Sequence, residues 1–147
     1  MGTSVYLSPG MFGFAKVASY AYFEHIVTAL ERRFSLRGRS CRVTICDVHP
    51  TASVRRRATK LCRVIHETAG EGNDPIHIIG HSTGGLDARL VASPSVHLPG
   101  ITTAELAWLP RLSSITTMNT PHFGTPLAAF FATKSGQQVL YAVSALT

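Results

Sequence analysis

The feature that most constrains the fold of this 147-residue chain is a regular alternation of short apolar runs with longer stretches of helical periodicity. Apolar runs ended by turn residues predict buried strands, and apolar residues spaced three and four apart predict amphipathic helices. The expected strands lie at 5–7, 42–48, 76–79 and 114–118. The expected helices lie at 20–34, 54–69 and 83–92, followed by two helical pieces within 127–147 that break near Gly136. This order predicts an α/β fold class, with a parallel sheet of about four strands and helices on both faces.

Length and composition indicate a single globular domain spanning residues 1–147. Hydrophobic residues make up 45% of the chain and charged residues 15%, a balance that argues against disorder. No apolar run approaches the roughly 18 residues of a transmembrane helix, and the start of the chain lacks the basic and apolar regions of a signal peptide. We therefore expect a cytoplasmic protein. The three cysteines, Cys41, Cys46 and Cys62, are expected to be buried free thiols.

The helix expected at 54–69 has clear end signals and one apolar face. Ser53 is the candidate N-cap, and Gly70 marks the C-terminal end. The apolar face consists of Val54, Ala58, Leu61, Ile65 and Ala69. The basic residues of this segment are expected on its solvent side; they are Arg55, Arg56, Arg57, Lys60 and Arg63.

A glycine-rich corner joins the third strand to the third helix. Gly80-His81-Ser82-Thr83-Gly84 fits the pattern G-x-S-x-G, in which a serine sits on a tight strand-to-helix turn with its hydroxyl exposed. Gly80 and Gly84 are the glycines that such a turn needs, because a Cβ atom at either position would clash. The alternative is a glycine-rich turn that serves close packing or holds an anion, with Ser82 as a helix N-cap.

The residues from His77 to Arg89 resemble the nucleophile-elbow segment of bacterial triacylglycerol lipases and related esterases of the α/β-hydrolase fold. The segment from Val5 to Phe14 resembles the first strand and oxyanion loop of those enzymes. The segment from Asn119 to Pro126 resembles the loop that follows their next strand. One departure is Pro9-Gly10, where these lipases often have His-Gly. The resemblance implies that the expected strands are the middle of a larger hydrolase sheet.

In that family Ser82 would attack the carbonyl carbon of an acyl ester. The backbone N–H groups of Met11 and Thr83 would hold the oxyanion that forms. The apolar loop Met11–Phe14 beside this site favours a lipid or other acyl ester as substrate, and the alternative is that the loop is part of the core. The resemblance implies no cofactor, and the histidines and cysteines show no metal-ligand spacing.

A serine nucleophile needs a histidine base that an acid orients, and in this fold both follow the serine. The acids after the serine are Asp87 and Glu105, and the histidines are His97 and His122. We expect Asp87 to pair with a nearby arginine and His122 to serve as part of the loop framework. His77, within a strand, is expected to be a satisfied core histidine.

The chain is therefore expected to be an N-terminal portion of a hydrolase whose acid and base lie elsewhere. Its last strand would then form an exposed, apolar sheet edge through which the chain could self-associate. The alternative function is a catalytically inactive hydrolase-like remnant or binding module that keeps the serine corner without the triad.

The formal charge of +6 is concentrated in one stretch of the sequence. Ten of the fourteen basic residues lie between Arg32 and Arg63, which allows a third interpretation as a nucleic-acid or anionic-membrane surface. These charges lie in turns and on the outer face of a helix, without the interleaved aromatic residues of single-strand binders. A solvated surface is the favoured interpretation, and no nucleic-acid partner is expected.

Overall fold

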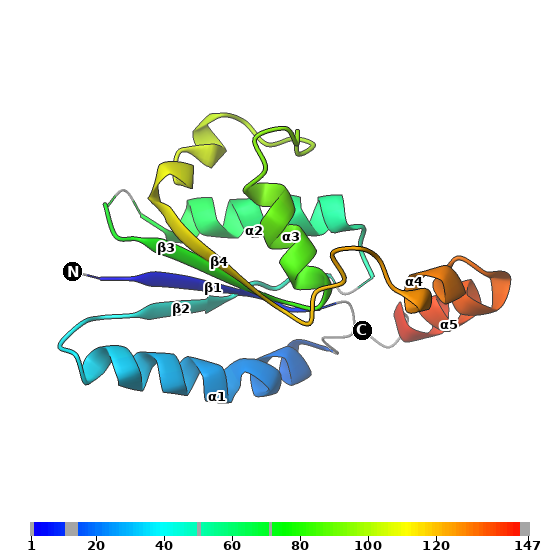
Figure 1. Cartoon of the computed structure of the whole chain (residues 1–147), viewed down its shortest axis with the longest axis horizontal. Coiled ribbons are helices and arrows are strands. Elements are labelled where there is room, and N and C mark those ends of the chain that lie inside the picture. Colours follow the sequence, from blue (N-terminus) through cyan, green and yellow to red (C-terminus); the bar gives the residue numbers. More distant parts are fainter. Residues whose placement is uncertain (1, 11–14, 50, 71, 145–147) are drawn as a thin grey trace.

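The computed structural model describes residues 2–10, 15–49, 51–70 and 72–144, with the backbone alone for 15–22, 143 and 144. Its sheet has four strands, all parallel, in the order β2-β1-β3-β4 (Figure 1). The strands are β1 (Ser4–Ser8), β2 (Arg42–Ile45), β3 (Ile76–His81) and β4 (Leu112–Met118). The predicted parallel α/β architecture is confirmed, although β2 ends earlier and β4 begins earlier than the sequence indicated.

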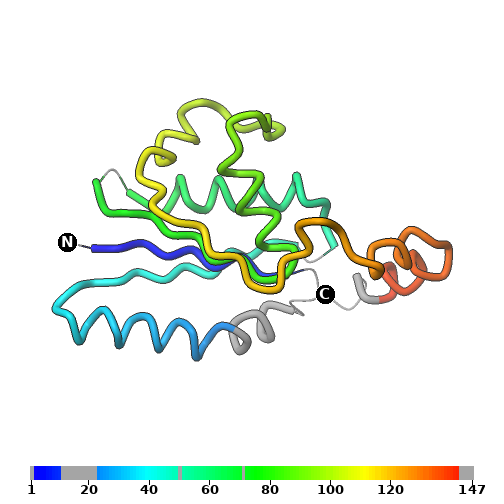
Figure 2. The backbone as a smooth tube through the Cα atoms, viewed as in Figure 1, coloured from blue at the N-terminus to red at the C-terminus, as the bar shows by residue number. Residues whose placement is uncertain are grey.

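Helices cover both faces of the sheet, as predicted (Figures 1 and 2). Helix α1 lies on one face, and α2 and α3 lie on the other. The helices are α1 (Ala15–Ser35), α2 (Val54–Thr68), α3 (Thr83–Val91), α4 (Pro126–Phe131) and α5 (Lys134–Ser144), with short 3-10 helices η1 (Ala104–Leu106) and η2 (Leu109–Arg111). Helix α1 begins at Ala15, ahead of the predicted start near residue 20.

Strand β1 lies between two neighbouring strands and under helices on both sides, so all five of its residues are buried. Its alternate side chains enter two different cores. Val5 and Leu7 pack with Phe23 of α1. Tyr6 belongs to the larger core beneath α2 and α3, which also contains Trp108. This two-sided burial is typical of a central parallel strand.

The ends of α2 follow the sequence signals. Ser53 Oγ accepts a hydrogen bond from the backbone N–H of Arg56 at 3.4 Å, so Ser53 is the N-cap as predicted. Gly70 follows the helix with φ of +64°, a left-handed conformation that glycine adopts without steric cost.

The prediction that every basic residue of α2 faces solvent is wrong for Arg57, which is only 2% exposed. Arg57 follows Val54 by three residues and precedes Leu61 by four, and this spacing places it on the buried face of the helix. The other four basic residues are exposed as predicted; they are Arg55, Arg56, Lys60 and Arg63.

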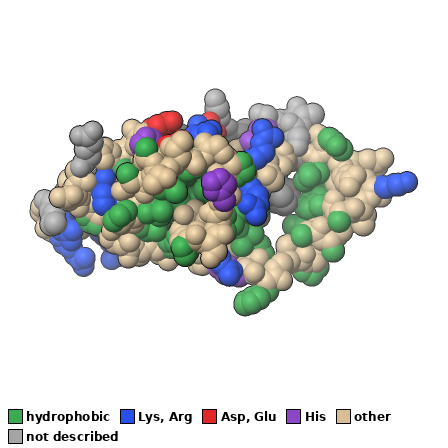
Figure 3. Space-filling model, turned by 90° about the horizontal axis from the view of Figure 1, so that it is seen from above, with side chains coloured by type: hydrophobic (Ala, Val, Ile, Leu, Met, Phe, Trp, Pro, Cys, Tyr) green, Lys and Arg blue, Asp and Glu red, His purple; other side chains and the backbone are tan. Residues whose placement is uncertain are grey.

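Helices α4 and α5 form a pair that extends away from the sheet (Figure 1). The two predicted helical pieces are confirmed, but the break between them lies before Gly136, because α4 ends at Phe131 and α5 begins at Lys134. Gly136 lies inside α5, where a Cβ atom would clash with the carbonyl oxygen of Phe130. The glycine therefore permits close packing of the two helices instead of interrupting one. Large apolar side chains are exposed on this pair, as the right-hand part of Figure 3 shows; they include Leu127, Phe130, Val139 and Tyr141.

Strand β4 forms one edge of the sheet, but this edge is not apolar as predicted. Its exposed side chains are polar and comprise Ser113, Ser114, Thr116 and Thr117. His77 of β3 lies beside this strand, with Nδ1 2.7 Å from Ser114 Oγ. His77 therefore has a hydrogen-bond partner as predicted, but it is half-buried and does not belong to the core. Self-association through this edge stays a prediction.

The basic residues between Arg32 and Arg63 do not share one face of the molecule. Arg32 and Arg33 lie in the last turn of α1, whereas Arg55 and Arg56 lie in α2 on the opposite side of the sheet. The sequence cluster is thus divided by the fold. The cysteines are free, with Cys46 and Cys62 buried and Cys41 half-buried. None of the described helices is long and apolar enough to span a membrane.

Candidate active site

Ser82 occupies a strained turn between β3 and α3. Its φ of 54° and ψ of −127° lie in a region that side-chain-bearing residues rarely adopt. The backbone is fixed there because the Ser82 N–H donates to the Met118 carbonyl at 2.9 Å and the Gly85 N–H donates to the Ser82 carbonyl at 3.1 Å. Ser82 does occupy the N-cap position of α3, as the alternative interpretation had it, but its side chain makes no capping hydrogen bond.

The glycines of this corner allow backbone segments to approach too closely for any side chain. A Cβ atom at Gly80 would lie 2.5 Å from the Gly84 carbonyl oxygen, and one at Gly84 would clash with the Ser8 carbonyl oxygen. Gly85 is also required, because a Cβ atom there would clash with the Thr120 hydroxyl. This third glycine contact joins α3 to the loop after β4, which sequence spacing does not indicate.

The loops that follow β1 and β3 meet at Ser82, because these strands are neighbours in the sheet. A Cβ atom at Gly10 would lie 2.6 Å from Ser82 Cβ and 3.1 Å from Ser82 Oγ. Gly10 therefore brings the backbone of the first loop directly against the serine. This arrangement at the carboxyl ends of adjacent parallel strands is a common location for an active site in open α/β sheets.

Of the two predicted oxyanion donors, Thr83 lies within the described residues and Met11 does not. Thr83 is the first residue of α3, where a backbone N–H has no acceptor within its own helix. Its hydroxyl Oγ1 is buried without a hydrogen-bond partner in the described part of the chain. Met11 and the rest of the loop Met11–Phe14 lie outside the described residues.

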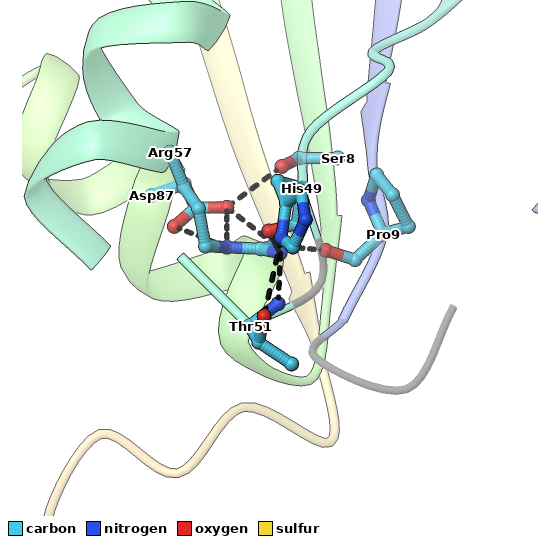
Figure 4. A network of polar contacts seen from close by, with 6 residues as sticks. All are labelled: Ser8, Pro9, His49, Thr51, Arg57 and Asp87. Atoms are coloured by element: carbon cyan, nitrogen blue, oxygen red, sulfur yellow. Dashed lines mark hydrogen bonds and ion pairs between the residues drawn. The ribbon is translucent and has the colours of Figure 1, made fainter. Parts of the chain in front are cut away.

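A buried ion pair lies beside the serine corner (Figure 4). Arg57 Nη2 is 2.8 Å from Asp87 Oδ2, and Arg57 Nε lies 3.2 Å and 3.1 Å from the two carboxylate oxygens. Both side chains are almost fully buried, at 1% and 0% exposure. The predicted pairing of Asp87 with an arginine is confirmed.

The same arginine also holds the loops around it. Its Nη2 donates to the carbonyl of Pro9, and its Nη1 donates to the carbonyl of His49 at 3.3 Å. Ser8 Oγ donates to the Asp87 carboxylate at 3.1 Å. Burial raises the pKa of Asp87, and the attached Arg57 and Ser8 oppose this shift. The network fixes the Pro9–Gly10 segment that lies against Ser82.

Sequence reasoning missed Arg57 as a residue of this site. Two features of the sequence could have indicated its role. Arg57 lies on the apolar face of α2, and Asp87 is an acid within the following helix that needs a partner. A buried arginine and a buried aspartate on neighbouring helices are each other's natural partners, since an unpaired buried charge is very unfavourable.

Among the other acid and histidines after the serine, Glu105 and His122 form side-chain contacts, and His97 forms a contact through its backbone carbonyl. Glu105 accepts the Thr102 N–H at 2.8 Å and lies 3.3 Å from Arg63 Nε. Its hydrogen bonds from Thr102, the backbone one foremost, hold the pKa of Glu105 below its usual value. His122 Nε2 lies 3.2 Å from the Thr117 hydroxyl, and its Nδ1 is buried with no partner among the residues described. The carbonyl of His97 accepts a hydrogen bond from Arg55 at 3.2 Å.

Comparison with known proteins gives a distant relationship. No protein-family model matches the chain. The chain is 29% identical over 146 residues to a triacylglycerol lipase of Pseudomonas fragi. The aligned region covers 95% of this chain and 43% of the lipase, so the chain spans less than half the length of that relative.

Proposed function

We propose that this chain carries the nucleophile-bearing part of a serine esterase or lipase of the α/β-hydrolase fold. The observation that supports this most directly is the backbone of Ser82, with φ of 54° at a strand-to-helix turn and a side chain that caps nothing. Strain of this kind costs about 1–3 kcal/mol and is found mainly where a functional group must be held in place. The similarity to a lipase supports the same assignment.

In the proposed reaction Ser82 Oγ attacks the carbonyl carbon of an acyl ester while its proton passes to a base. The N–H groups of Thr83 and Met11 hold the oxyanion, the alcohol leaves with a proton, and water then releases the acid from the acyl-serine. Neither Asp87 nor Glu105 is free to orient a histidine, since each is held by an arginine. The base and its acid are therefore proposed to come from outside this chain.

The proposed substrate is an acyl ester with an apolar chain. Exposed apolar side chains occur in the segment that follows β4; they are Phe123, Leu127 and Phe130. Exposed apolar surface suits an acyl group better than a polar substrate. No cofactor or metal is part of this proposal.

The test is labelling with a fluorophosphonate, read by intact mass and peptide mapping. Without its histidine the serine should react slowly, and added imidazole, acting as an external base, should raise the labelling rate. We expect this label on Ser82 in the unaltered chain and in Ser95→Ala, an exposed serine control. Ser82→Ala should remove it. A folded chain that shows no Ser82-dependent label with or without imidazole would favour the alternative, an inactive remnant or binding module.

A further inference from the structure

A hollow of about 580 Å³ opens between the loop after β2 and the first turns of α2. The side chains that line it are mostly basic or polar, and they include Asp47, His49, Thr51, Arg56, Arg57 and Lys60. Ser82 does not line it, and the residue that it shares with the surroundings of the serine corner is Arg57. A volume of this size is typical of pockets that hold small organic molecules.

Two cations at the rim of this hollow lack a carboxylate partner. Arg56 and Lys60 lie four residues apart on α2, so their side chains share one face of the helix. Neither forms an ion pair within 4.0 Å with a carboxylate in the described part of the chain. Like charges at this spacing repel each other, and a bound anion between them would relieve the repulsion.

The hollow also touches Arg57, whose positive charge is already balanced. Arg57 is 2% exposed, and its guanidinium is engaged by Asp87 and by the carbonyls of Pro9 and His49. The charge of Arg57 is balanced by Asp87. Among the described lining residues, Asp47 is the single carboxylate. The positive charges of Arg56 and Lys60 exceed its one negative charge, so the hollow has a net positive charge.

His49 and Thr51 contact each other at the wall of the hollow. The Thr51 N–H donates to His49 Nδ1 at 3.4 Å, and the Thr51 hydroxyl lies 3.2 Å from the same nitrogen. The charged donors that the hollow offers to an anion are the guanidinium of Arg56 and the ammonium of Lys60.

We propose that this hollow binds a phosphate dianion, carried by a phosphate monoester whose organic part fills the remaining volume. Guanidinium and ammonium groups form short, charge-assisted hydrogen bonds with phosphate oxygens, and the two rim cations match the two negative charges of the dianion. The basic residues of α1 lie on the other side of the sheet, so the arrangement suits a small ligand and not an extended polyanion. This proposal stands independently of the proposed ester hydrolysis.

The test is isothermal titration of the full chain with inorganic phosphate and with glycerol 3-phosphate at fixed ionic strength. The variant Arg56→Gln/Lys60→Gln should bind each at least about tenfold more weakly, because it loses two charge-assisted contacts. The matched control is Arg32→Gln/Arg33→Gln, which loses the same charge from α1 and should bind as the unaltered chain does. Urea unfolding midpoints of both variants confirm that each is folded.

Three outcomes would overturn the proposal. They are no saturable binding of either phosphate, an equal loss in both double variants, and sulfate or chloride binding as tightly as phosphate. Vesicles with phosphatidic acid, compared with vesicles of phosphatidylcholine alone, distinguish the source of the phosphate. Binding to the former as well as to glycerol 3-phosphate assigns the hollow to a lipid headgroup, and binding to glycerol 3-phosphate alone assigns it to a soluble monoester. If the chain binds the phosphatidic acid vesicles but binds neither inorganic phosphate nor glycerol 3-phosphate, the site is a charged surface instead of a pocket, and the proposal is contradicted.

Discussion

Arg57 Nη2 lies 2.8 Å from Asp87 Oδ2, and this buried ion pair joins α2 to α3. The same guanidinium donates to the carbonyls of Pro9 and His49 in the loops after β1 and β2. The hydroxyl of Ser8 donates to the Asp87 carboxylate. One arginine thus links segments that are distant in the sequence. The interior next to the serine corner is organised by charge and hydrogen bonds instead of apolar packing alone.

Removal of one partner of this pair should destabilise the chain strongly. We expect Arg57→Met to lower the free energy of unfolding by about 3–5 kcal/mol, because it leaves the Asp87 carboxylate buried without its counter-ion. Arg57→Met/Asp87→Ala should lose clearly less than the sum of the single changes, since neither charge is then left alone. Lys60→Met, at an exposed position of the same helix without an ion pair among the described residues, should change stability by less than about 0.5 kcal/mol. Urea denaturation of Arg57→Met, Asp87→Ala, the double variant and Lys60→Met measures these effects; additive losses in the first three would contradict a coupled pair.

Gly84 should tolerate no side chain. In Gly84→Ala the new Cβ meets the backbone carbonyl of Ser8, which cannot rotate away as a flexible side chain would. We expect a loss of about 3 kcal/mol in the free energy of unfolding, at the upper end for overpacking. Gly72→Ala is the matched control, because nothing lies within 4 Å of its Cβ position and its φ is not positive. Equal thermal unfolding midpoints for the two variants would show that the close approach at Gly84 is absent in solution.

Relief of backbone strain at Ser82 should stabilise the fold. Glycine adopts a φ of 54° freely, so Ser82→Gly should exceed Ser82→Ala in the free energy of unfolding by about 1 kcal/mol. This order is the reverse of the usual effect, in which glycine is the less stable of the two at a helix or strand position. A Ser82→Ala variant that is the more stable in urea would mean that the turn is unstrained.

The pH dependence of stability should carry a contribution from His77. Burial, together with the positive charge of Arg39, lowers the pKa of His77 from its usual value of 6.5. The unfolded chain then takes up a proton more readily than the folded one, so stability falls as the pH drops through 6.5 and levels off below the folded-state pKa. His77→Gln removes this contribution. The difference in urea midpoint between the unaltered chain and His77→Gln should change between pH 8 and pH 5. If the midpoints of the two proteins change in parallel with pH, the effect is excluded.

Local signals predicted the elements of the fold well where they came from consecutive residues. The cap at Ser53, the turn at Gly70 and the strand-to-helix corner at Ser82 depend on neighbours in the chain, and the sequence shows those neighbours directly. The parallel sheet followed from the order of strands and helices. Its strand order places β1 beside β3, which local periodicity does not determine.

The errors arose where a tertiary contact overrode a local rule. Arg57 was assigned to solvent by its charge, although its spacing on α2 placed it on the buried face, and only Asp87 makes that burial tolerable. Gly136 was interpreted as a helix breaker, yet the reason for a glycine there is the backbone of Phe130. The spacing of Arg57 did indicate a buried position, whereas the contact of Gly136 depends on another helix and could not be obtained from residue type and spacing.

The pairing of Ser4 with Ile76 has a consequence for the order of events during synthesis. The centre of the sheet cannot form until β3 has left the ribosome, although β1 and β2 are made much earlier. Asp87 emerges later still, so until then Arg57 has no counter-ion within the apolar core that α2 begins to form. A nascent chain that ends between β2 and α3 should therefore be a target for chaperones and proteases, and the fold should become protected only once Asp87 has been added.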